Sequence, residues 1–118
     1  MTQTFTITPP PSANKLFRNA TAKDNVRGRI KTKAYNQWRD MVAWEIKLQR
    51  NGHKTLTGPA TISVTLRRPH PLTDLSNMVK PVEDAMQEAG VVKNDRQFVS
   101  IMASWAVHDG CRVKVSEA

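Results

Sequence analysis

Apolar residues along this chain recur at two spacings, one typical of strands and one typical of helices. Stretches in which every second residue is apolar predict strands, and stretches with apolar residues three and four positions apart predict helices. The predicted strands cover residues 4–8, 61–66, 99–107 and 113–115, and the predicted helices cover residues 33–50 and 75–89. This β-α-β-α-β-β order predicts an α+β fold with a mixed sheet and both helices packed on one face.

The first predicted helix begins after Thr32, whose hydroxyl is a suitable N-cap, and ends at Asn51-Gly52, a pair that favours left-handed backbone. Trp44 and Leu48 lie off its apolar stripe, so we expect this helix to have a second apolar contact, such as a dimer partner. The stripe expected to face the core is Tyr35, Trp38, Met41, Val42 and Ile46.

The second predicted helix ends at Gly90, and Pro81 constrains where it begins. A proline deep inside a helix loses a hydrogen bond and clashes with the preceding turn. Regular helix is therefore expected to begin only around Met78, or to have a distorted first turn. The apolar stripe of this helix is Leu75, Met78, Val79, Val82, Met86 and Ala89. After it, two alternating runs flank His108-Asp109-Gly110, which predicts a β-hairpin.

Charge is distributed unevenly along the chain. The 118 residues suit a single domain spanning residues 1–118, and they carry a net charge of +8. Residues 1–57 hold eleven Lys and Arg against three Asp and Glu, whereas residues 58–118 hold seven of each. A basic segment, residues 12–33, concentrates this excess, which favours binding to nucleic acid over a solvated loop or an acidic protein partner. The expected DNA-binding residues are Lys15, Arg18, Lys23, Arg27, Arg29, Lys31, Lys33, Arg67 and Arg68.

Several classes of protein are excluded by composition. No apolar run approaches the roughly 20 residues of a membrane span, and the N-terminus lacks the features of a signal peptide, so we expect a cytoplasmic protein with no membrane partner. Cys111 is the one cysteine, which excludes an intramolecular disulfide and a cysteine zinc site.

The stretch from Thr73 to Gln97 carries the candidate chemistry. Magnesium in nucleases is held by one or two carboxylates together with water and substrate phosphate. Asp74 before the second helix and Asp95 after it are candidate metal-binding and catalytic residues, and Lys80 is placed to reach a phosphoryl oxygen. From the residues alone a structural interpretation stands beside this one. Asp74 is then an N-cap, Lys80 and Asp84 form an i,i+4 surface pair, and Asp95 is a turn residue.

Three groups of residues resemble a known family, and one of them is Ala34-Tyr35 with Arg39-Asp40 in the first predicted helix. Pro10-Pro11-Ser12-Ala13-Asn14 is similar to a P-P-S-x-N segment, with Asn14 at its final position. Asp74, Asn77, Lys80, Asp84-Ala85, Gly90, Asp95 and Gln97 follow the order and spacing of a D-x-D-N-x-x-K…D-A-L…G…D-D-x-Q-V pattern. On these motifs, which touch most of the chain, the sequence resembles the RusA family of Holliday-junction resolvases, small homodimers common in phages and prophages.

The resemblance implies a nuclease that cuts four-way DNA junctions with paired nicks, using Mg²⁺ or Mn²⁺ and no small-molecule cofactor. It assigns metal-binding and catalytic roles to Asp74 and Asp95 and a catalytic role to Lys80. Asn77 is expected to order the aspartate loop, and Asp84 to make a structural hydrogen bond. The basic segment is expected to hold the junction arms.

The sequence departs from the family pattern at Ser76, which replaces the second aspartate, and at Asn94, which replaces the first of the paired downstream acids. Serine can contact a metal but brings no charge, so metal affinity is expected to fall. Three functional classes therefore stay open: an active nuclease in which Asp84 or a water fills the gap, a junction-binding protein without efficient cleavage, and a DNA- or RNA-binding accessory protein.

Overall fold

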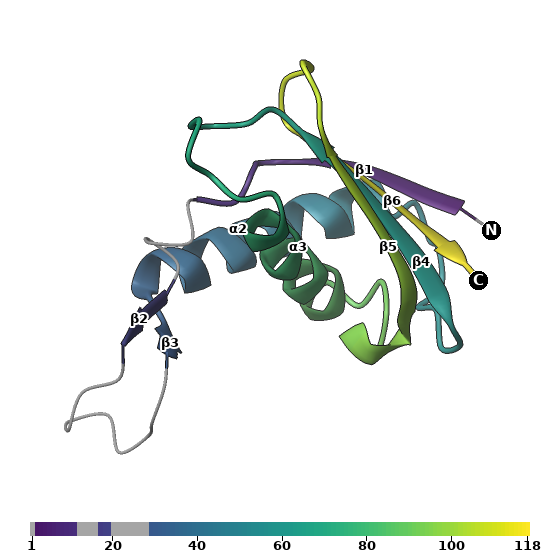
Figure 1. The fold of residues 1–118 in the computed structure, drawn as a ribbon. Coiled ribbons are helices and arrows are strands. Elements are labelled where there is room, and N and C mark those ends of the chain that lie inside the picture. The colour runs from purple at the N-terminus through teal and green to yellow at the C-terminus, as the bar shows by residue number, and fades with distance from the viewer. Residues whose placement is uncertain (1, 12–16, 20–28) are drawn as a thin grey trace.

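The computed structural model describes residues 2–11, 17–19 and 29–118, with side chains described in 2–11 and 32–118. The strands of its main sheet are β1 (Thr2–Ile7), β4 (Ala60–Leu66), β5 (Phe98–Trp105) and β6 (Cys111–Glu117). The helices are α2 (Lys33–Gln49) and α3 (Ser76–Glu88), with a short 3₁₀ turn, η2 (Asp95–Gln97), before β5. Both long helices lie on one face of the sheet, which confirms the predicted α+β architecture (Figure 1).

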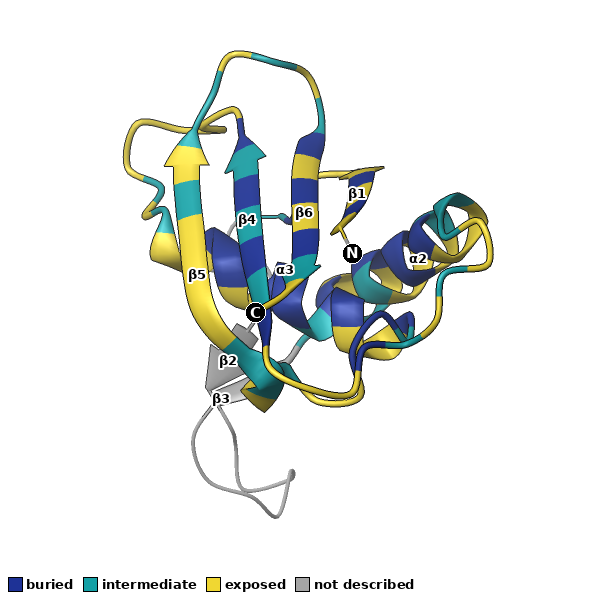
Figure 2. Cartoon of the chain, turned by 90° about the vertical axis from the view of Figure 1, so that its right-hand side faces the viewer, coloured by how far each residue is buried: buried dark blue, intermediate teal, exposed yellow. Residues whose placement is uncertain are grey.

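The strand order is β1-β6-β4-β5, with β4 and β5 parallel and the other pairs antiparallel. The parallel pair is the expected product of the β4-α3-β5 crossover. The predicted hairpin between the last two strands is wrong, because β4 lies between β5 and β6 (Figure 2). The connection after Trp105 crosses the end of β4, where the Ala106 amide donates to the Leu66 carbonyl at 2.8 Å. Residues 106–110 are enough to span two strand spacings of about 5 Å each.

Helix α2 is capped and terminated as the sequence predicts. The Thr32 hydroxyl accepts a hydrogen bond from the Tyr35 amide at 3.2 Å, and Asn51 and Gly52 take positive φ values of 51° and 78°. One residue of the predicted core stripe is wrong, since Met41 is 46% exposed. The buried face of α2 includes Ala43 instead, so it is rotated toward Ala43 and away from Met41.

The basic segment contains two short strands that the sequence analysis did not predict. Strands β2 (Phe17–Asn19) and β3 (Arg29–Lys31) pair antiparallel as a separate two-stranded sheet. This β2–β3 ribbon directly precedes α2 and lies apart from the main sheet (Figure 1). The ribbon is part of the basic segment and leads directly into the first turn of α2.

The two edges of the main sheet differ. At the β1 edge, the Gln49 side chain on α2 accepts from the Thr6 amide at 2.9 Å and donates to the Thr6 carbonyl at 2.8 Å. Helix α2 thus satisfies the outward hydrogen-bonding groups of Thr6 in β1. Strand β5 forms the opposite edge, and most of its residues are exposed (Figure 2). The exposed apolar residues of β5 are Val99, Ile101 and Met102.

Candidate active site

Helix α3 begins at Ser76, earlier than Met78, and contains Pro81. Its entry is tight: the Asn77 amide donates to the Asp74 carbonyl at 3.2 Å, and the Met78 amide donates to the Leu75 carbonyl at 3.0 Å. These i→i−3 bonds make a 3₁₀-like first turn, which agrees with the predicted distortion. Leu75 is the N-cap and makes no side-chain capping bond, so the interpretation of Asp74 as an N-cap is wrong.

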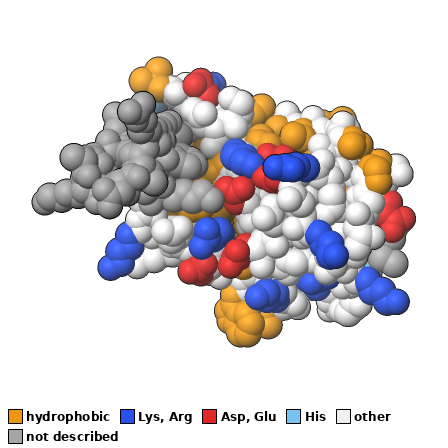
Figure 3. Space-filling view, turned by 90° about the horizontal axis from the view of Figure 1, so that it is seen from below, with side chains coloured by type: hydrophobic (Ala, Val, Ile, Leu, Met, Phe, Trp, Pro, Cys, Tyr) orange, Lys and Arg blue, Asp and Glu red, His pale blue; other side chains and the backbone are white. Residues whose placement is uncertain are grey.

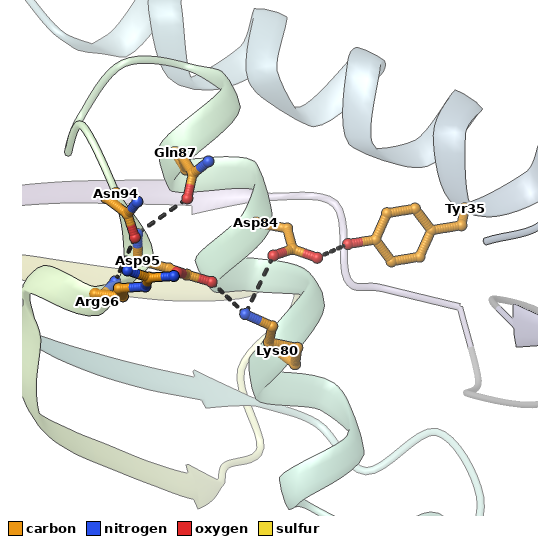
Figure 4. Close-up of polar contacts among 7 residues, drawn as sticks. All are labelled: Tyr35, Lys80, Asp84, Gln87, Asn94, Asp95 and Arg96. Atoms are coloured by element: carbon orange, nitrogen blue, oxygen red, sulfur yellow. Dashed lines mark hydrogen bonds and ion pairs between the residues drawn. The ribbon is translucent and has the colours of Figure 1, made fainter. Parts of the chain in front are cut away.

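Lys80 is the centre of the site. Its ammonium contacts an Asp95 carboxylate oxygen and lies 3.5 Å from Oδ1 of Asp84 (Figure 4). The hydrogen bond that Lys80 donates to Asp95 raises the pKa of Lys80 against the opposing effect of partial burial, and the charges of Asp84 and Asp95 add to the increase. Lys80 therefore carries a positive charge at neutral pH, in an environment where two carboxylates converge on one cation.

Asp95 is held in place from both ends of the connection between α3 and β5. It opens η2, and the Asn94 side chain caps that turn by accepting from the Arg96 amide at 2.9 Å. The Asp95 amide donates to Oε1 of Gln87, an exposed residue near the end of α3, at 2.9 Å (Figure 4). Asn94, which lacks the charge of the family's first acid, thus orients the aspartate that follows it.

Gln97 anchors this connection to the rest of the domain. Its Oε1 accepts from the amides of Lys93 and Asn94, at 2.8 and 2.9 Å. Its Nε2 donates to the carbonyls of Leu56 and Gly58, both at 2.9 Å. Gln97 was predicted as part of the motif, without a role. Its place two residues after a candidate catalytic aspartate could have indicated a supporting role, because its four hydrogen bonds fix the connection that carries Asp95.

Asp84 has partners on both long helices. One carboxylate oxygen accepts a hydrogen bond from the buried Tyr35 hydroxyl on α2, and the other faces Lys80 (Figure 4). Burial raises the pKa of Tyr35, and the hydrogen bond to Asp84 raises it further. The phenol is therefore protonated, and it acts as a donor, throughout the ordinary pH range. Tyr35 was predicted as a core residue with no role in the site.

A groove of about 540 Å³ runs between α3 and β5 beside Lys80. It is lined by Leu75, Ser76, Val79, Lys80, Glu83, Ile101 and Ala103. A larger hollow of about 740 Å³ is lined by residues 51–59 and the two C-terminal residues, which include none of the predicted site residues. The smaller groove contains both Ser76 and Lys80, which makes it the candidate active site.

Glu83 is a buried acid in this groove that the sequence analysis did not single out. It is 8% exposed, and burial raises its pKa despite the nearby Lys80 charge. A sequence signal was present, because Glu83 follows Val79 by four residues and precedes Met86 by three, on the apolar side of α3.

Replacing Glu83 with glutamine will stabilise the fold at pH 8 by about 1 kcal/mol, or about 4 °C in Tm. A raised folded-state pKa means that the ionised carboxylate costs more in the folded than in the unfolded chain. This cost is present above the folded pKa and vanishes below the unfolded pKa, so the gain will disappear near pH 3 (about one unit below the ordinary Glu pKa). Thermal unfolding at both pH values measures this gain in stability, with Glu88→Gln at an exposed position as the control. An equal gain at both pH values would contradict the assignment.

The remaining predicted metal residues lie at the start of α3. Asp74, Ser76 and Asn77 are exposed, and Ser76 borders the groove. Within residues 2–11, 17–19 and 29–118, no group of three or more His, Cys, Asp or Glu side chains is placed to hold a metal. The structure thus brings Lys80, Asp84 and Asp95 together, and the metal-binding roles of Asp74 and Ser76 stay predictions.

The predicted DNA-binding residues lie in several parts of the chain. Lys15, Lys23 and Arg27 lie outside the described residues, as does the motif residue Asn14, and Arg18, Arg29 and Lys31 lie on β2 and β3, where side chains are not described. Lys33 is exposed at the first residue of α2. Arg67 and Arg68 are exposed near the end of β4. Arg67 contacts the Val107 carbonyl and lies 3.5 Å from Asp109, and the Arg68 guanidinium stacks 5.4 Å from the Trp105 ring centroid.

Charge on the described surface is mixed. Figure 3 shows acidic side chains beside Lys and Arg on the face seen from below. Residues 12–31 hold six Lys and Arg and one Asp, so this short stretch carries +5 of the net charge of +8. The folded body around the groove therefore carries little net charge. None of the helices in the described part of the chain is long and apolar enough to span a membrane.

Comparison with known proteins agrees with this geometry. The family model for endodeoxyribonuclease RusA matches residues 6–116. The crossover junction endodeoxyribonuclease RusA of Aquifex aeolicus (strain VF5) is 30% identical over 94 residues, which cover 79% of this chain and 70% of that protein. The match begins near the end of β1 and spans both long helices and the Lys80–Asp95 contact. The chain belongs to the RusA family of endodeoxyribonucleases.

Proposed function

We propose that this protein is a metal-dependent endonuclease that resolves Holliday junctions in DNA recombination and repair in the cytoplasm. The observation that carries the proposal is the Lys80 ammonium held between the carboxylates of Asp84 and Asp95 at the edge of a groove. Its family membership adds the reaction class, because the Aquifex relative is named a crossover junction endodeoxyribonuclease.

The residues at this site fit a divalent cation. Two carboxylates converge on one positive charge, and Mg²⁺ in proteins takes one or two carboxylates and keeps several waters. Asp95 would hold the ion, with Asp74 and the Ser76 hydroxyl as further proposed contacts from the start of α3. When bound, Mg²⁺ or Mn²⁺ activates a water and offsets charge on the phosphoryl oxygens.

Lys80 has a separate role in the proposal. A protonated ammonium at the groove edge stabilises the negative charge that develops on phosphoryl oxygens, and it can donate a proton to the leaving oxygen. The hydrogen bonds made by Gln87 and Gln97 hold Asp95 in place, so the charge pair is formed before DNA arrives. The basic segment would supply the phosphate contacts, in keeping with its charge of +5.

Paired nicks on a two-fold substrate require two sites related by symmetry, so we propose a C2 homodimer. The β5 edge supports this interface. An uncovered edge strand pairs readily with another copy, and β5 carries exposed Val99, Ile101 and Met102. The α2 surface is the alternative interface: the sequence suggested Trp44 and Leu48 there, and Met41 is exposed beside them.

Val99→Asp will convert the dimer to a monomer, because a charge placed on a paired apolar edge is desolvated without a partner. Leu48→Asp, the matched change on the α2 surface, will leave the dimer intact. Light scattering coupled to gel filtration measures both masses. A monomer produced by Leu48→Asp alone would move the interface to α2, and a monomeric wild-type protein would refute the dimer.

The function is tested on a labelled four-way junction, with a linear duplex of the same sequence as control. We expect paired cleavage of the junction in Mg²⁺ and none after chelation with EDTA, while binding persists. Junction binding without cleavage in any concentration of Mg²⁺ or Mn²⁺ would indicate a binding protein of the same fold. Equal affinity for junction and duplex would indicate a general nucleic-acid-binding protein.

A further inference from the structure

We propose that Tyr35 is a positioning residue for cleavage: through Asp84 it sets the place of the Lys80 ammonium and connects that ammonium to the basic segment. This inference rests on the function proposed above and adds to it a residue from a different helix.

The geometry gives each oxygen of Asp84 a different task. The Tyr35 hydroxyl donates to Oδ2, and Oδ1 faces the Lys80 ammonium at 3.5 Å (Figure 4). Since Lys80 also contacts Asp95, the position of its ammonium depends on two carboxylates. The Tyr35 bond fixes the orientation of one of them. Loss of this bond changes the orientation of the Asp84 carboxylate and, with it, the position of the Lys80 ammonium.

Tyr35 is itself rigidly held. It is fully buried, and its ring meets Trp38 edge to face with centroids 6.4 Å apart. A buried ring in a packed core transmits displacement instead of absorbing it. The Trp38 indole in turn donates to the Thr8 carbonyl after β1 at 3.0 Å, so this end of α2 is fastened to the main sheet.

The first turn of α2 joins Tyr35 to the basic segment. Thr32 follows β3 directly, and its hydroxyl accepts from the Tyr35 amide at 3.2 Å. The β2–β3 ribbon and Tyr35 are therefore joined through this one turn. The chain of contacts runs from the ribbon through Thr32, Tyr35 and Asp84 to Lys80. Its central bond joins Tyr35 and Asp84, which are 49 residues apart in sequence.

Tyr35→Phe tests the inference, because it keeps the buried ring and removes the hydroxyl alone. We expect single-turnover junction cleavage to fall about tenfold, with junction affinity within about twofold of wild type. Asp84→Asn will slow cleavage as well, and the double variant will be no slower than Asp84→Asn alone. Gln49→Met, which removes hydrogen bonds from the opposite end of α2, is the matched control and will cleave at the wild-type rate.

A second measurement does not depend on cleavage. The ¹⁵Nζ signal of Lys80 in the free protein will shift in the same direction in Tyr35→Phe and in Asp84→Asn, and will stay in place in Gln49→Met. Wild-type cleavage by Tyr35→Phe, or additive losses in the double variant, would overturn the inference while leaving the proposed nuclease intact. Absence of cleavage by the wild type would instead refute the proposed nuclease, and an unmoved Lys80 signal in Tyr35→Phe would still overturn the positioning role.

Discussion

Asp95→Asn will lower junction cleavage about 10³-fold, equivalent to about 4 kcal/mol in the barrier. Asparagine keeps the size of the side chain and removes the charge that would hold a divalent cation. It also removes the charge-assisted hydrogen bond that raises the pKa of Lys80. Junction affinity will be equal or higher, because a carboxylate near the phosphates is lost. Mn²⁺ binding followed by electron paramagnetic resonance will weaken in parallel with cleavage.

The control for this variant is Asp109→Asn, which makes the same charge change on a 97% exposed side chain paired with Arg67. Its cleavage and Mn²⁺ binding will equal those of the wild type. Thermal unfolding of both variants shows whether the fold is retained. We expect it to be, because Asp95 is only partly buried and the hydrogen bond to Gln87 is donated by the Asp95 backbone amide, not by the carboxylate. Asp95→Asn that retained a tenth of the wild-type rate would remove Asp95 from the reaction.

Local signals in the sequence predict much of this fold. The Thr32 cap, the left-handed Asn51-Gly52 end and the alternation in residues 61–66 each depend on neighbours within a few positions, and the structure confirms all three. Strand order depends on distant segments instead. Alternation shows which face of β5 is apolar but not which strand lies beside it, so the turn signal at Gly110 predicted a hairpin across a position that β4 occupies.

The candidate site likewise has residues that local patterns predicted and residues that only the packing of distant segments reveals. Lys80 and Asp95 were predicted together from the motif and its resemblance, and the structure places them in contact. Tyr35 was predicted only as a core residue, because its bond to Asp84 joins two helices that no local pattern connects. Helical spacing predicted the Lys80–Asp84 pair as a surface feature. The structure contains this pair, with the Lys80 side chain 57% exposed, and adds to it the Tyr35 bond and the contact with Asp95.

Lys80→Met will lower junction cleavage about 10²- to 10³-fold, the effect of removing one preorganised charge that stabilises a transition state. Methionine retains the length and apolar stem of lysine, which lies along the groove wall near Val79 and Ile101. Unlike Asp95→Asn, this variant will keep Mn²⁺ binding or strengthen it, because Asp95 loses the ammonium that neutralises its charge. Loss of cleavage with retained metal binding would separate the role of the lysine from that of the aspartate.

Lys93→Met is the matched control, since Lys93 is exposed in the same connection and contributes its backbone amide to Gln97. It will cleave at the wild-type rate. Junction affinity of Lys80→Met will fall by at most a few-fold, because one phosphate contact among many is lost. If Mn²⁺ binding and cleavage were lost together in Lys80→Met, the lysine would act by holding Asp95 in place. Retained metal binding with lost cleavage would instead indicate that the ammonium acts on the phosphate. Its contacts with Asp84 and Asp95 would then serve to position it.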